Sequence, residues 1–173
     1  MHIHKLFFLL VMLPFLAQAQ RAKKDYTAEL KKLAGYWTGK LQYTDYSDDK
    51  KQVTLKTNLS VVDAGDSLIM KMVYYESATD SIVSSFGMYL TGDAEQLHFD
   101  GEVYNVLHVI NNGNRLTFRT MPDDEERETM DNNKKAEIKR TFTIAANGFV
   151  IVKEVKYEGT KDFFVRNTYT FTR

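Results

Sequence analysis

The stretch Trp37–Val61 reads WTGKLQYTDYSDDKKQVTLKTNLSV, and it decides the class of fold. Apolar and polar residues alternate over residues 37–43 and again over 53–61, and the polar segment Ser47–Lys51 separates the two runs. Alternation with a period of two is the pattern of a β-strand that buries one face. A short polar segment between two such runs indicates a hairpin. We therefore expect two antiparallel strands here, with Trp37 on the buried face.

The same alternation continues toward the C-terminus in about eight further segments, each bounded by Gly, Asp or Asn. They run approximately over Ser67–Tyr75, Ser81–Leu90, Gln96–Phe99, Glu102–Ile110, Arg115–Met121, Glu137–Ala145, Phe149–Tyr157 and Asp162–Thr172. Joins as short as Asn147-Gly148 connect antiparallel neighbours, because parallel strands need a long crossover. We predict an all-β, antiparallel, up-and-down meander of about ten strands, which hides its edges best by closing into a barrel.

The segment 122–135 (PDDEERETMDNNKK) interrupts this pattern, because it is acidic first, basic after, and has little apolar content. Its composition favours a solvated loop or a frayed hairpin extension. A mobile lid over the barrel mouth is a second interpretation. A calcium loop is a third, although the acids lack the alternating spacing and central Gly of an EF-hand.

Residues 1–19 have the layout of a secretory signal peptide. Lys5 precedes an apolar run over residues 6–16, and small residues at 17 and 19 suit cleavage before Gln20. The apolar run is short for a membrane-spanning helix, and the alternative interpretation is a buried N-terminal helix. We expect an exported protein, periplasmic or extracellular, whose mature part, residues 20–173, forms one domain. Because the chain has no Cys, we expect neither disulfides nor a lipid anchor on an N-terminal Cys.

The charge balance bounds the class of partner. The 23 Lys and Arg residues equal the 23 Asp and Glu residues in number. A near-neutral chain argues against nucleic acid as a partner, because binding to phosphates needs a basic surface. We also expect no integral membrane span in the mature chain.

A short helix is expected before the first strand, over residues 22–33. Asp25 or Thr27 is available as its cap, and Gly35 suits a left-handed end. One face of this helix carries apolar side chains, namely Tyr26, Leu30 and Leu33.

The segment Leu33–Gly39 (LAGYWTG) places a helical turn and then Gly-x-Trp at the start of the meander. This arrangement resembles the lipocalins and the wider calycin superfamily, and in particular uncharacterised lipocalin-like proteins secreted by Bacteroidetes-type bacteria. The resemblance implies that the helix plugs one end of the barrel and that Trp37, after Gly35, packs inside that end. It also implies that an Arg of the last strand, Arg166 or Arg173, lies over the indole. No assigned activity comes with it.

The resemblance does not extend to ligand sites. Fatty-acid-binding barrels hold a carboxylate with Arg-x-Tyr on the last strand, whereas Arg166 and Tyr169 are three apart here and point to opposite faces of a regular strand. Nitrobindin-type haem barrels need a His near the C-terminus, and the last His of this chain is His108.

Candidate binding residues are polar or pliable side chains on apolar faces. Arg140 lies two residues from both Ile138 and Phe142, and Asn105 and Lys153 interrupt apolar runs in the same way. A buried guanidinium needs an internal acid, a bound anion or a route to water. In a barrel too wide to fill, further side chains would line an apolar wall, namely Met72, Tyr74 and Phe86.

No catalytic residue is identified. The Ser residues lack a nucleophile elbow, the paired acids lie in turns, and His98 and His108 are too few for a zinc site, so we expect no metal and no cofactor. The expected function is non-enzymatic binding of a small apolar or amphipathic molecule in the cell envelope. The alternative is an envelope interaction protein with a filled barrel, whose surface binds a protein or a polysaccharide; an enzyme that uses the cavity is a third hypothesis.

Overall fold

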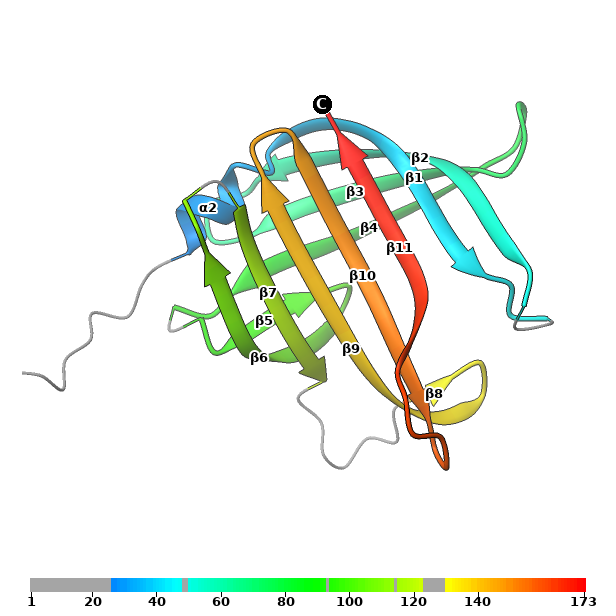
Figure 1. Cartoon of the computed structure of the whole chain (residues 1–173). Helices are drawn as coiled ribbons and strands as arrows, with labels where there is room; N and C mark the ends of the chain where they lie inside the picture. Colours follow the sequence, from blue (N-terminus) through cyan, green and yellow to red (C-terminus); the bar gives the residue numbers. More distant parts are fainter. Residues whose placement is uncertain (1–25, 48–49, 93, 114, 123–129) are drawn as a thin grey trace, which may run out of the picture.

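The structure is a computed structural model, and it describes residues 26–47, 50–92, 94–113, 115–122 and 130–173 (Figure 1). Residues 1–19, the predicted signal peptide, lie outside the described residues. Helix α2 spans Thr27–Lys31 and precedes a sheet of eleven strands. The strands are β1 (Gly35–Thr44), β2 (Gln52–Asp63), β3 (Leu68–Tyr75), β4 (Ser81–Leu90), β5 (Gln96–Phe99), β6 (Glu102–Asn111), β7 (Arg115–Pro122), β8 (Met130–Asp131), β9 (Lys134–Ala145), β10 (Gly148–Tyr157) and β11 (Phe164–Thr172).

The sheet closes on itself into an antiparallel barrel, which confirms the predicted fold class. Each strand of the ring pairs with the next one in the order β1 to β7, β9, β10, β11, and β11 pairs back onto β1. Among the described residues, strand β8 pairs with β9 alone, at Met130–Lys135 and Asp131–Lys134. The short β8–β9 hairpin therefore lies outside the ring of ten, within the segment interpreted from sequence as a loop.

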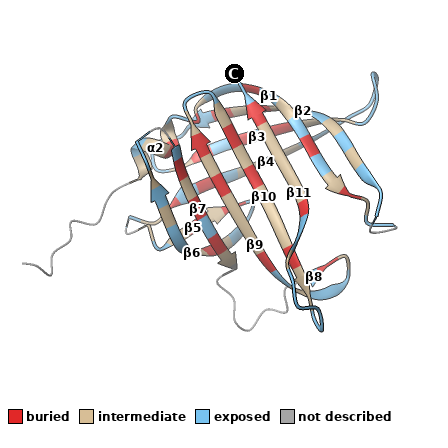
Figure 2. Ribbon diagram, in the orientation of Figure 1, coloured by how far each residue is buried: buried red, intermediate tan, exposed pale blue. Residues whose placement is uncertain are grey.

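Alternation along the strands places the core inside the barrel, as Figure 2 shows by its alternating bands of buried and exposed residues. Trp37, Leu59 and Phe142 are fully buried, as the sequence pattern predicts. The register pairs inward residues directly across neighbouring strands, for example Trp37 with Leu59 and Leu59 with Met72. Side chains from opposite walls also touch: Phe99 of β5 and Phe142 of β9 lie 5.0 Å apart between ring centroids. These two rings therefore fill part of the barrel interior.

One end of the barrel is closed by α2 and Trp37. The indole Nε1 donates a hydrogen bond of 2.7 Å to the carbonyl of Leu33, just after the helix. Arg173 lies over the indole, 4.3 Å from its centroid, so Arg173 and not Arg166 takes the place that the resemblance implies. The helix begins after Tyr26 without a side-chain cap, and it ends before Gly35. Gly35 instead opens β1 with a φ of +126°, a conformation that favours glycine.

No helix among the described residues has the length and apolar character that a membrane crossing requires.

Candidate functional site

The candidate site is the part of the inner face that surrounds Arg140, on β9. Arg140 pairs in register with Thr120 of β7 and with Lys153 of β10, so all three side chains belong to one inward row. The guanidinium Nε donates a hydrogen bond of 2.7 Å to the hydroxyl of Tyr104, from β6. The central carbon of the guanidinium, Cζ, also lies 5.6 Å from the ring centroid of Phe99. Arg140 is thus held inside the barrel by a neutral hydroxyl and an aromatic face.

Within the described ranges no carboxylate forms an ion pair with the Arg140 guanidinium. Burial raises the pKa of the Asp100 carboxyl and the charge of Arg140 opposes this, so the exposed Asp100 interacts with Arg140 at longer range. The side chain is only partly buried, so an incoming molecule can reach it. A cation that has lost part of its hydration without gaining a counter-ion in direct contact is costly. This position is therefore ready to receive an anion.

Two further tyrosines lie on the inner face, on strands that are not neighbours. The hydroxyls of Tyr74 on β3 and Tyr169 on β11 are 3.4 Å apart, and β1 and β2 separate the two strands in the sheet. The contact therefore spans the barrel. Burial chiefly raises the pKa of Tyr74, and the nearby Tyr169 raises it further. Burial also raises the pKa of Tyr104, against the opposing effect of the Arg140 charge. The hydroxyls of Tyr74 and Tyr104 stay protonated at neutral pH and can donate hydrogen bonds.

The apolar residues proposed from sequence line the same inner face. Met70 pairs with Phe86 and Met72 with Ser84, so Met72, Tyr74 and Phe86 share the inward side of β3 and β4. Met72 is fully buried, whereas Tyr74 and Phe86 are partly exposed. Phe86 contacts Phe99 edge-on at 4.9 Å. Through Phe99, which also touches Arg140, the apolar wall and the cation belong to one site.

Asn105 does not belong to this site, and the sequence-based assignment of its face is wrong. Its neighbour Tyr104 is buried and pairs with the buried Leu97, so Asn105 lies on the outer face of β6. The register of β6 shifts between Val106 and His108. Before this bulge Tyr104 and Val106 face inward, and after it Val109 does. Apolar residues therefore occupy both alternating positions of the strand, and the sequence alone does not show which face is buried.

A second polar cluster lies beyond Arg140, at the end of the barrel opposite α2. Its centre is Asp131, which is 2% exposed. Lys153 Nζ lies 2.6 Å from one carboxylate oxygen, and Arg166 Nε lies 3.2 Å from the other. The Tyr157 hydroxyl donates a hydrogen bond of 2.9 Å to that second oxygen. Asp131 lies in the charged segment 122–135, yet it is buried and forms ion pairs. This corrects the interpretation of its position as part of a solvated loop.

Arg166 owes its position to a bulge in β11. Lys153 pairs with Asn167 and Glu154 with Val165, which leaves Arg166 without a directly opposite residue on β10. Its guanidinium is fully buried and lies 3.8 Å from the ring centroid of Tyr46. Strict alternation over the strand does not anticipate this inward turn.

Three cationic side chains lie on the inner face, namely Arg140, Lys153 and Arg166. Among the described ion pairs, Asp131 contacts two of them, and Asp100 and Asp45 interact electrostatically with Arg140 and Arg166. Burial lowers the pKa of Lys153, and its bond to Asp131 opposes this effect; the charges of Arg140 and Arg166 lower it further. The cationic side chains thus repel one another, and this repulsion favours an anion.

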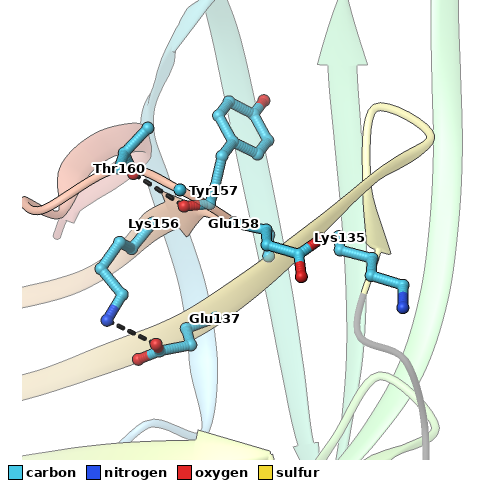
Figure 3. Close-up of a pocket in the computed structure, with 8 residues that line it drawn as sticks. Lys135, Glu137, Lys156, Tyr157, Glu158 and Thr160 are labelled. Atoms are coloured by element: carbon cyan, nitrogen blue, oxygen red, sulfur yellow. Dashed lines mark hydrogen bonds and ion pairs between the residues drawn. The ribbon is translucent and has the colours of Figure 1, made fainter.

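A hollow of about 420 Å³ lies at the ends of β9 and β10 (Figure 3). Lys156 forms an ion pair with Glu137 there, and both face away from the barrel interior because their neighbours Val155 and Ile138 face inward. The hollow is a feature of the outer surface, and we do not assign the site to it.

Both histidines of the predicted mature chain lie on the outer face. His98 stacks on Tyr89 with ring centroids 4.1 Å apart, and His108 is exposed. Neither can reach a molecule inside the barrel.

Comparisons with known proteins support the fold and leave the site unassigned. No family model matches the sequence, and neither does any curated protein. Among solved structures, the chain is similar to Rv2717c from M. tuberculosis, with 10% sequence identity and a TM-score of 0.57 over 84% of this chain and 95% of that chain. It is also similar to a protein of unknown function from Nostoc punctiforme, of the DUF3598 family, with 15% identity and a TM-score of 0.48 over 83% of this chain and 48% of that chain. The likeness to Rv2717c concerns the barrel fold alone.

Proposed function

We propose that this protein is a non-enzymatic binding barrel that holds a small amphipathic molecule in the cell envelope. The anionic head group binds at Arg140, and the apolar part lies against Tyr74, Phe86 and Phe99. One observation carries the proposal: a guanidinium inside the barrel whose hydrogen-bond partner among the described residues is a neutral hydroxyl. A bound anion supplies the charge-assisted hydrogen bonds that this position lacks.

The wall around Arg140 suits such a ligand. Its rings are apolar over most of their surface, while the hydroxyls of Tyr104, Tyr74 and Tyr169 supply a few fixed donors. Binding sites for small molecules usually combine an apolar lining with a small number of convergent polar groups. The partly exposed side chains on the inward face of β3 and β4 leave this wall accessible.

We also propose that the chain is an exported, lipocalin-like barrel. The support is the signal-peptide layout of residues 1–19, together with a plug made by α2 and by Trp37 under Arg173. In this proposal the mature protein carries its ligand outside the cytoplasm.

The test compares two arginines that lie one strand apart. Arg140→Met removes the inward charge, and Arg119→Met removes an exposed charge from β7, where Arg119 pairs with Thr141 on the outer face. The probes are cis-parinaric acid, which is a fluorescent fatty acid, and its uncharged methyl ester. Loss of a charge-assisted hydrogen bond of about 1.5–3 kcal/mol weakens binding of the acid by at least about tenfold in Arg140→Met.

The expected pattern is specific for the acid and for Arg140. The methyl ester binds wild type and both variants equally, and Arg119→Met binds the acid as wild type does. Equal affinity of wild type and Arg140→Met for the acid removes Arg140 from the site.

A second function has its own support, namely surface binding by a filled barrel. Val62 and Ile69 pair with each other on the outer face and are 56% and 50% exposed. Exposed apolar side chains grouped in this way are typical of interaction surfaces. If wild type binds neither probe, this envelope interaction function, with a protein or polysaccharide as partner, is the one to pursue.

A further inference from the structure

The β8–β9 hairpin, residues Met130–Lys135, is named the strap here because it reaches across the inside of the barrel end. It starts from β9, yet its tip residue Asn132 donates a hydrogen bond of 2.9 Å to the carbonyl of Tyr46, just after β1. Strands β10 and β11 lie between β9 and β1 in the sheet. Figure 1 shows the strap at the opposite end of β9 from α2.

The strap places a buried carboxylate, that of Asp131, against polar side chains of β10 and β11. Asp131 accepts hydrogen bonds from Lys153 and Tyr157 of β10 and forms an ion pair with Arg166 of β11. A carboxylate from another molecule could interact with the same three side chains.

Lys153 links this cluster to the proposed ligand site. It pairs in register with Arg140, and both side chains lie on the inner face of adjacent strands. Neighbouring strands are about 5 Å apart, so an anion seated at Arg140 is within reach of Lys153. The ammonium then has two competing partners, the ligand and Asp131.

We propose that the strap is an internal stopper, in which Asp131 occupies a position where the carboxylate of a ligand can bind. A carboxylate ligand that enters the barrel forms an ion pair with Lys153 in place of Asp131, and the strap is released. This inference rests on the proposed function, because it assigns a means of regulation to the same site. The ligand class is an amphipathic carboxylate, because an uncharged molecule cannot form an ion pair with Lys153.

Thermodynamic linkage makes the proposal measurable in both directions. If the ligand binds better when the strap is released, then weakening the strap strengthens binding, at most by the factor by which release of the strap becomes easier. The turn of the strap offers a matched pair of variants. Asn132 and Asn133 both have positive φ, at +52° and +59°, so glycine preserves the turn at either position. Only Asn132 makes the tether to Tyr46 among the described side-chain hydrogen bonds of these two residues.

The experiment combines hydrogen–deuterium exchange with probe titration on the full mature chain. In wild type, saturating cis-parinaric acid speeds exchange of the strap amides, and its methyl ester leaves their exchange unchanged. Asn132→Gly binds the acid roughly two- to tenfold more tightly than wild type, the range that one lost hydrogen bond corresponds to. Asn133→Gly binds the acid as wild type does.

The outcomes separate this inference from the function on which it rests. If the acid binds but strap exchange does not change, or if the two Gly variants bind the acid equally, the stopper is refuted and the binding function stands. Faster strap exchange with the methyl ester refutes the competition for Lys153. If the acid binds neither wild type nor Asn132→Gly, both proposals fail.

Discussion

Replacing Trp37 with Ala tests the plug end of the barrel. The indole is fully buried, donates a hydrogen bond of 2.7 Å to the Leu33 carbonyl and lies under Arg173. Truncating a buried Trp to Ala costs about 3–5 kcal/mol through lost transfer energy and the void left behind. The lost hydrogen bond and cation–π contact add about 1 kcal/mol. We expect Trp37→Ala to lower the free energy of unfolding by about 4–6 kcal/mol.

The assay is urea unfolding followed by circular dichroism. Fluorescence does not serve, because Trp37 is the single Trp of the chain. With a slope of about 2 kcal/mol per M urea, the expected loss moves the midpoint down by about 2–3 M. Tyr36→Ala is the matched control, since Tyr36 is the neighbouring aromatic residue and is 58% exposed. A midpoint shift worth less than about 1 kcal/mol for Trp37→Ala, comparable to that of the control, refutes the reasoning.

Three further predictions follow from the same structure. Gly39→Ala places a Cβ 2.1 Å from the Thr170 carbonyl oxygen and lowers the melting temperature clearly, whereas Gly87→Ala, whose Cβ meets nothing within 4 Å, leaves it nearly unchanged. Above about pH 10 the free energy of unfolding falls with pH, because tyrosines with raised pKa keep their protons in the folded state and lose them in the unfolded state. Urea titrations at about pH 8 and about pH 10.5 measure this difference, and equal stabilities at the two pH values contradict it. The tyrosines concerned are Tyr46, Tyr74 and Tyr104. The native protein begins at Gln20, and N-terminal sequencing that finds Met1 contradicts export.

The strand pattern was readable from sequence because burial of one face imposes a period of two. Strands β4 and β5 have the bounds Ser81–Leu90 and Gln96–Phe99 that alternation predicts. Strand β8 escapes this reasoning, since Met130 and Asp131 are too few residues to show any period. The inward position of Arg140 was predictable for the same reason as the strands, because β9 has no register shift against its neighbours.

The candidate site was only partly predictable, because irregularities break the alternation. A bulge reverses the expected face of Asn105, and another turns Arg166 inward. The Tyr104 hydroxyl that holds Arg140 comes from β6, two strands away in the sheet. No pattern within either strand relates the two residues.

The sequence by itself determined the all-β class, the meander order and the buried face of most strands, since these depend on interactions between near neighbours in the chain. Only the tertiary structure decided which charges meet. Asp131 lies in a segment that is polar throughout, yet closure of the barrel brings it against Lys153 and Arg166 from two other strands. Whether a charged side chain is solvated or paired depends on which side chains the fold places beside it, and the composition of the local sequence does not determine those neighbours.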